Sequence, residues 1–185
     1  MSAVQLEINL EFTPNPMTLK YVFSQPLKVE GSNYYLSKEE AEKYSPMANR
    51  LFDVDTVGAV MICQEFISVT YSDRNTMREA HEAVINAIKE QLEACDTVCL
   101  PREDSGVEDA DEMVTKIQAI IESDIRPSLA ADGGDINFIR YKDSIVYVTM
   151  MGACSGCPHA QMTLKNGVLT RLQADLPEIE DIVSI

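Results

Sequence analysis

The N-terminal half of the chain alternates short strand patterns with helical ones. Four segments place apolar and polar side chains in alternation or in short apolar runs, which is typical of half-buried and buried strands. The letters TPNP separate the first two of these segments and predict a turn. Ser37 and Ser45 are suitable N-caps for two short helices, because their hydroxyls can accept from helical N–H groups. We therefore expect strands over residues 4–12, 18–24, 57–64 and 65–72, and helices over residues 37–45, 45–53 and 76–95.

The C-terminal half repeats this alternation in another order. Apolar residues from Met113 to Ile125 recur at i, i+4, i+7 and i+8, which predicts an amphipathic helix. Pro127 should kink or restart that helix. In the following DGGD, we attribute both glycines and both acids, Asp132 and Asp135, to turn formation rather than to a cation site. We then expect a hairpin of residues 135–142 and 144–151, a helix over residues 158–174 and a closing strand over residues 178–185.

A break in composition divides the two halves. Residues 100–110 combine Pro, Gly, Ser and a cluster of charges, the composition of an exposed connection. We expect an N-terminal domain of residues 1–99, a linker of residues 100–109 and a C-terminal domain of residues 110–185. The predicted fold class is α+β, with two small domains that each pack helices on one face of a small β-sheet.

The composition excludes some classes of binding partner and some cellular locations for this protein. Fifteen basic against thirty acidic residues give a formal net charge of −15, which repels nucleic acid and anionic membranes. The longest apolar run, VGAVMIC, is too short to span a bilayer. No basic residue precedes Lys20, so the start of the chain matches neither a secretory signal nor an arginine-rich presequence. We expect a cytoplasmic protein or, as the alternative, the mature form of a mitochondrial one, without nucleic-acid or membrane partners.

The segment MGACSGCPHAQMTLKNG, residues 151–167, carries the clearest candidate chemistry. It holds Cys154 and Cys157 between an expected strand and an expected helix, with Pro158 at the first helical position. Cys157 then falls near the N-cap, where N–H groups and the helix dipole favour a thiolate. Gly152 and Gly156 remove bulk beside the thiols and permit positive φ. The pair by itself leaves a redox dithiol, a metal site and an incidental pair open.

The surrounding sequence resembles a known family. IRPSLAADGGDINF, VTMMGACSGCPHAQMTLKNGV and LPEIEDIV resemble the C-terminal domain of the NifU family, and EFTPNPMTLKYVF with SPMANRLFDVDTVGAVMICQEFISVTY resembles the N-terminal domain of Nfu-type proteins. The resemblance covers nearly the whole chain. It implies an iron-sulfur cluster scaffold or carrier, not an enzyme, with Cys154 and Cys157 as cluster ligands. His159, where a small hydroxyl residue is expected, and the turn YKDS without its glycine are departures that remove no ligand.

The resemblance also implies how two thiols can suffice. A 4Fe-4S cluster needs four protein ligands, so two chains that meet at their loops would complete the shell. Such a homodimer would receive the cluster from assembly proteins and pass it to apo iron-sulfur target proteins by ligand exchange. The N-terminal domain we take to be a partner-docking module.

Several other interpretations remain. A thiol-disulfide oxidoreductase would also use CxxC, although there the motif should follow an early strand of a βαβ pattern rather than an antiparallel hairpin. A structural zinc module lacks a second Cys or His pair in the same domain. Cys95 and Cys99 could in principle complete a four-thiolate site with Cys154 and Cys157, but they lie in the other domain, across the linker. Cys63 fits a buried core position, and His81 fits a solvated helix face.

Overall fold

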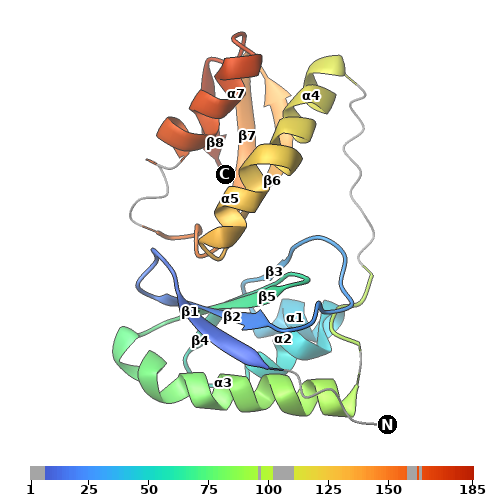
Figure 1. The fold of residues 1–185 in the computed structure, drawn as a ribbon, viewed down its shortest axis with the longest axis vertical. Helices are drawn as coiled ribbons and strands as arrows, with labels where there is room; N and C mark the ends of the chain where they lie inside the picture. The colour runs from blue at the N-terminus through green and yellow to red at the C-terminus, as the bar shows by residue number, and fades with distance from the viewer. Residues whose placement is uncertain (1–6, 96, 102–110, 158–161, 163) are drawn as a thin grey trace. The chain divides into compact units, whose positions relative to one another are not determined.

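The chain forms two compact units. The computed structural model describes residues 7–95, 97–101, 111–157, 162 and 164–185 (Figure 1). The units comprise Met1–Glu103 and Asp104–Ile185. The expected linker of residues 100–109 lies outside the described residues except at its start, where the Leu100 N–H donates to the Tyr44 carbonyl at 2.7 Å. Within the described part of the chain, no helix combines the length and apolar character needed to cross a membrane.

The first unit is built on a five-stranded sheet with strand order β1-β2-β5-β4-β3. All neighbouring strands in it are antiparallel. Four strands were predicted from the alternation of side chains, and the short strand β3 was not. The strands are β1 (Ile8–Phe12), β2 (Thr18–Phe23), β3 (Asn33–Tyr35), β4 (Val57–Ile62) and β5 (Phe66–Tyr71).

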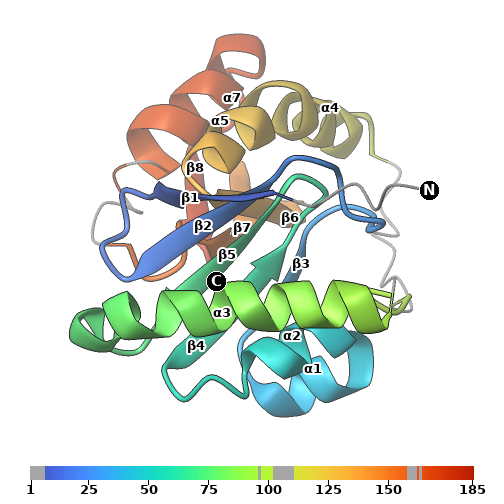
Figure 2. The same ribbon diagram turned by 60° about the horizontal axis from the view of Figure 1, so that its bottom comes forward.

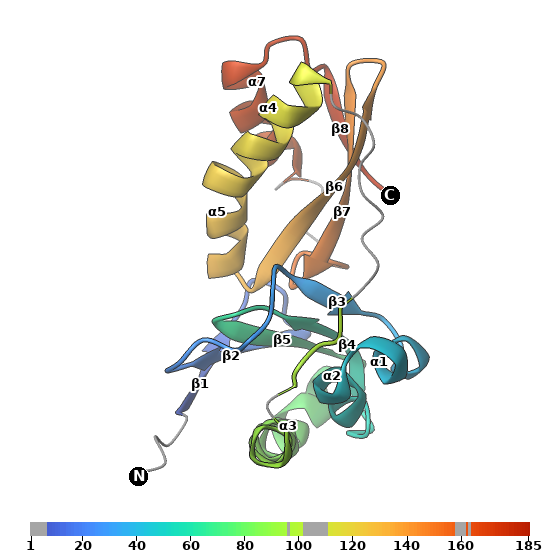
Figure 3. The same cartoon turned by 90° about the vertical axis from the view of Figure 1, so that its right-hand side faces the viewer.

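Three helices cover one face of this sheet (Figures 2 and 3). The two predicted N-caps are confirmed: the Ser37 hydroxyl accepts from the Glu40 N–H, and the Ser45 hydroxyl from the Ala48 N–H. Between helices and sheet lies a core of aliphatic and tyrosine side chains, among them Tyr21, Tyr35, Leu51, Ile67 and Ile88. The helices are α1 (Lys38–Tyr44), α2 (Pro46–Leu51) and α3 (Arg74–Ala94).

The second unit opens with a helix that changes its hydrogen bonding midway. The α-helix α4 (Glu112–Ile120) continues into a π-helical turn, η1 (Ile121–Ile125), and then into α5 (Arg126–Ala131). Pro127 lies in the first turn of α5, directly after the π turn, and has no N–H to donate to a carbonyl of that preceding turn. The expected interruption at this proline is therefore confirmed, and it takes the form of a π turn directly before it.

The second unit has a three-stranded sheet with order β6-β7-β8. β6 (Gly134–Lys142) and β7 (Ile145–Gly152) form the predicted antiparallel hairpin. The closing strand β8 (Asp181–Ser184) pairs with β7 in parallel, which the sequence did not predict. Parallel neighbours need a crossover connection. The described part of that crossover includes the π turn η2 (Leu164–Leu169) and the helix α7 (Thr170–Asp175).

The helices of the second unit lie along one face of its sheet, as Figure 3 shows. Apolar side chains from both layers form its core, including Ile117, Ile136, Val148, Leu172 and Ile182. Both units thus combine a small sheet with helices, and the α+β class is confirmed.

Candidate metal centre

The two cysteines of the CxxC motif lie in a turn directly after β7. Gly152 and Gly156 have φ of +59° and +69°, in the left-handed region that favours glycine, as their places in the sequence suggested. Backbone hydrogen bonds tie this turn to the end of β7 and to the turn before β6. They run from Ala153 N–H to Gly133 O (3.0 Å), from Cys154 N–H to Met151 O (3.3 Å) and from Ser155 N–H to Gly152 O (3.1 Å).

Cys154 points into the protein. Cys154 is 8% exposed and packs with the apolar core of the second unit. Burial raises the pKa of the Cys154 thiol to about 12, and the negative charges of Asp132, Cys157 and Asp135 add to the effect. The sequence predicted a favoured thiolate only for Cys157, at the expected helix start. The Cys154 sulfur has the opposite tendency, because it faces apolar side chains and acids. A metal would therefore displace a proton from Cys154 on binding.

Cys157 is half-buried and differs from Cys154 in this respect. Pro158 and His159, on which the expected N-cap position of Cys157 depends, lie outside the described residues. The structure thus places both candidate ligands in one turn. The more accessible thiol is the one nearer the crossover.

Asp135 lies near the start of β6, next to the cysteine turn. The expected strand of residues 135–142 is confirmed, and it begins one residue earlier, because Gly134 of the expected DGGD turn is the first residue of β6. The Asp135 carboxylate is buried; its Oδ1 accepts from the Ile136 N–H at 2.7 Å and lies 3.6 Å from Arg126 Nε. A compensated buried charge therefore lies in the strand next to the cysteine turn.

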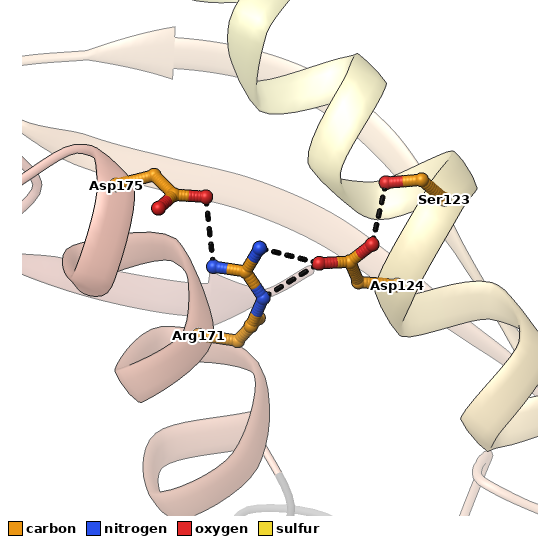
Figure 4. Close-up of polar contacts among 4 residues, drawn as sticks. All are labelled: Ser123, Asp124, Arg171 and Asp175. Atoms are coloured by element: carbon orange, nitrogen blue, oxygen red, sulfur yellow. Dashed lines mark hydrogen bonds and ion pairs between the residues drawn. The ribbon is translucent and has the colours of Figure 1, made fainter.

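An ion-pair network holds the crossover helix to the first helix of the unit (Figure 4). Arg171 on α7 donates from Nε to Asp124 Oδ2 at 2.7 Å and from Nη1 to Asp175 Oδ2 at 2.8 Å. Its Nη2 also pairs with Asp124, and the Ser123 hydroxyl donates to Asp124 Oδ1 at 2.7 Å. The hydrogen bond from the Ser123 hydroxyl lowers the pKa of Asp124 most, and the hydrogen bond from Arg171 lowers it further. The pair of Arg171 and Asp175 could have been predicted from its four-residue spacing on a helix. The contact of Arg171 with Asp124, 47 residues away in the sequence, could not.

The other cysteines belong to the first unit. The Cys95 sulfur, which is exposed, accepts from the Thr97 N–H at 3.3 Å. The Cys99 sulfur lies 3.8 Å from the Ser45 hydroxyl, at the junction of α1 and α2. Both therefore have local polar contacts within the first unit.

Cys63 was expected to be a buried core residue, and this is wrong. It follows the last residue of β4, is half-buried, and has its sulfur 3.3 Å from the Ser32 hydroxyl. His81 lies on α3 with Nδ1 2.6 Å from the Arg78 carbonyl oxygen. Among the residues that the structure describes, no group of three or more His, Cys, Asp and Glu side chains is placed to hold a metal ion.

Comparison with known proteins assigns both units. The family model "Scaffold protein Nfu/NifU N terminal" matches residues 8–95, and the "NifU-like domain" model matches residues 117–183. The two units thus define a protein that joins an Nfu N-terminal domain to a NifU-like domain. The chain belongs to the family of NFU1 iron-sulfur cluster scaffold proteins, as its resemblance in sequence indicated.

Individual relatives match along most of this chain. The human protein named "NFU1 iron-sulfur cluster scaffold homolog, mitochondrial" is 31% identical over 183 residues, which cover 96% of this chain and 71% of the relative. The protein of the same name from Drosophila grimshawi is 33% identical over 182 residues. The chain spans 61% of that fly protein's length. A solution structure of a NifU-like protein from Saccharomyces cerevisiae aligns with a TM-score of 0.48 at 22% identity, covering 55% of this chain and 92% of that one.

Proposed function

We propose that this chain holds a 4Fe-4S cluster between the Cys154 and Cys157 thiolates of two copies and transfers it to apo target proteins. The observation that carries the proposal is the shortage of ligands in the second unit. Its sequence contains two cysteines, and its described residues bring no third potential ligand to them. A cluster with four thiolate ligands then requires two copies of the turn.

The chemistry of the turn suits a cluster that is cargo rather than a permanent cofactor. Each chain contributes two soft thiolates, the ligand type that iron-sulfur clusters require. Cys157 is half-buried, so an acceptor's thiolate can approach its side of the shell. Exchange of ligands moves the cluster intact and needs no turnover, so the chain acts as a scaffold and not as an enzyme.

The partners follow from this role. Assembly proteins would donate the cluster and apo iron-sulfur proteins would accept it, with the domain of residues 1–99 serving to dock partners. The relatives' names specify mitochondria, which favours the mitochondrial alternative over the cytoplasmic one for this chain. We propose that the chain works there.

A thiol-disulfide oxidoreductase is the second candidate, and one observation favours it. The cysteine turn leads into a crossover between the parallel strands β7 and β8, so it does occupy a βαβ unit. The raised pKa of Cys154 argues against this role, because reactive dithiols rely on a thiolate with a lowered pKa.

Anaerobic reconstitution with iron and sulfide, followed by metal and sulfide analysis, tests the proposal. We expect about two iron and two sulfide per chain. The loaded protein should activate an apo iron-sulfur acceptor, and it should show no catalytic reduction of a disulfide substrate. Tight zinc binding without uptake of iron and sulfide, or disulfide reductase turnover, would refute the proposed function.

A further inference from the structure

Gly134 is a glycine whose backbone conformation does not explain it. It is the first residue of β6 and lies opposite Gly152 in the β6–β7 register. The neighbouring Gly133 has φ of +75°, whereas Gly134 is not among the described glycines with positive φ. An alanine could therefore adopt the Gly134 backbone conformation without strain. The glycine is instead explained by the room available for a side chain at this position.

The space beside Gly134 is filled by Cys154. A Cβ built on Gly134 would lie 2.2 Å from Cys154 Sγ, and 3.0 Å from both Cβ and N of Cys154. Real Cβ atoms essentially never approach a heavy atom to less than 3.0 Å. Rotation of the Cys154 side chain could remove the first contact, but the other two would remain and would press on the backbone of the turn.

We infer that Gly134 is a positioning residue for Cys154, because its missing side chain leaves the space in which that sulfur lies. The inference rests on the proposed function, since it concerns where one cluster ligand is held. Backbone hydrogen bonds fix the turn itself, including the 3.3 Å bond from Cys154 N–H to Met151 O. Gly134 adds the remaining constraint, on the direction of the thiol.

The consequence for cluster binding is large because of symmetry. In a dimer that uses each position twice, a displaced Cys154 displaces two of the four ligands. Changes beside metal ligands typically cost about 10- to 100-fold in metal affinity. Most such losses of affinity lie in the dissociation rate. We therefore expect Gly134→Ala, which retains both thiols, to release its cluster to a chelator faster than wild type, by about 10- to 100-fold.

The apo protein provides the first test, without any cluster. Cys154 and Cys157 are alkylated with iodoacetamide under native conditions, and each modified peptide is quantified by mass spectrometry. Gly134→Ala should speed alkylation of Cys154 several-fold and leave Cys157 unchanged. Gly58→Ala is the matched control, because it is also a strand glycine and its Cβ would meet nothing closer than 3.5 Å. An unchanged rate at Cys154 would overturn the inference.

A double variant separates the collision from a general loss of stability. If alanine at position 134 collides with the sulfur, Gly134→Ala should lower Tm less in a Cys154→Ala background than in the wild type. Equal losses in both backgrounds would overturn the inference, and this comparison holds even if Gly134→Ala is too unstable for alkylation at room temperature.

The loaded protein provides the second test. Gly134→Ala should lose its cluster to the chelator faster and should show a shifted electron paramagnetic resonance spectrum of the reduced cluster, while Gly58→Ala should match wild type. Equal or slower release with an unchanged spectrum would overturn the inference. A wild-type protein that takes up no cluster would instead refute the proposed function and the ligand-directing role together, whereas faster alkylation would still establish the packing.

Discussion

Replacing Cys154 by serine should cost the protein both its cluster and part of its stability. Serine keeps the size but exchanges a soft thiolate for a hard, scarcely ionised hydroxyl, and the dimer loses two of four ligands. Because Cys154 is 8% exposed and lies in the core of the second unit, the new hydroxyl would be buried among apolar side chains. Burying an unsatisfied hydroxyl costs about 1 to 3 kcal/mol. In a domain of this size that lowers Tm by at least about 4 °C.

Two matched serine variants separate the two losses. Cys157→Ser removes the other ligand from a half-buried position, so it should abolish cluster binding with little effect on the apo fold. Cys63→Ser should bind the cluster normally and lose less than about 1 kcal/mol, because its hydroxyl can hydrogen-bond to Ser32, now 3.3 Å from the sulfur. The assays are urea denaturation of the apo proteins and iron and sulfide content after identical reconstitution. Wild-type iron and sulfide in Cys154→Ser would refute the assignment of the site.

Three further predictions concern the scaffold around the site. Tyr71→Phe should destabilise the first unit by about 1 to 3 kcal/mol in urea denaturation, because the buried Tyr21 hydroxyl lies 2.5 Å from that of Tyr71 and would lose this partner. Replacing both tyrosines by phenylalanine should cost less than the sum of the two single changes. Ser144→Gly should raise stability by about 0.5 to 1 kcal/mol, because Asp143 and Ser144 occupy the left-handed region at φ of 52° and 60° in the β6–β7 turn; an unchanged or lower Tm would contradict this. The fragment of residues 107–185 should fold and bind a cluster alone, as circular dichroism and iron analysis would show, and a folded fragment without cluster would argue against the proposed domain division.

The elements that depend on local periodicity could be predicted from the sequence. The strands β1, β2, β4 and β5 and the helix α3 have patterns long enough to be recognised, and Ser37 and Ser45 mark helix starts by their own chemistry. Strand β3 has three residues, too few for a period to appear. The parallel pairing of β7 with β8 depends on how distant segments meet, which no local pattern contains.

The same distinction applies to the candidate site. The cysteine pair and the positive φ of Gly152 and Gly156 follow from residue types within one turn. The inward direction of Cys154 and the space left by Gly134 arise where the turn after β7 meets the start of β6. Neither contact can be recognised from the residues adjacent to the cysteines, and so the burial of Cys154 was not predicted.

Sharing of one cluster by two chains is the central claim, and native mass spectrometry of the anaerobically reconstituted full chain tests it most directly. The proposal predicts a species with the mass of two chains plus one 4Fe-4S cluster. Removing the cluster with a chelator should return the mass of single apo chains. A single chain that carries a complete 4Fe-4S cluster would contradict the shared shell and would direct the search for the missing ligands to Cys95 and Cys99.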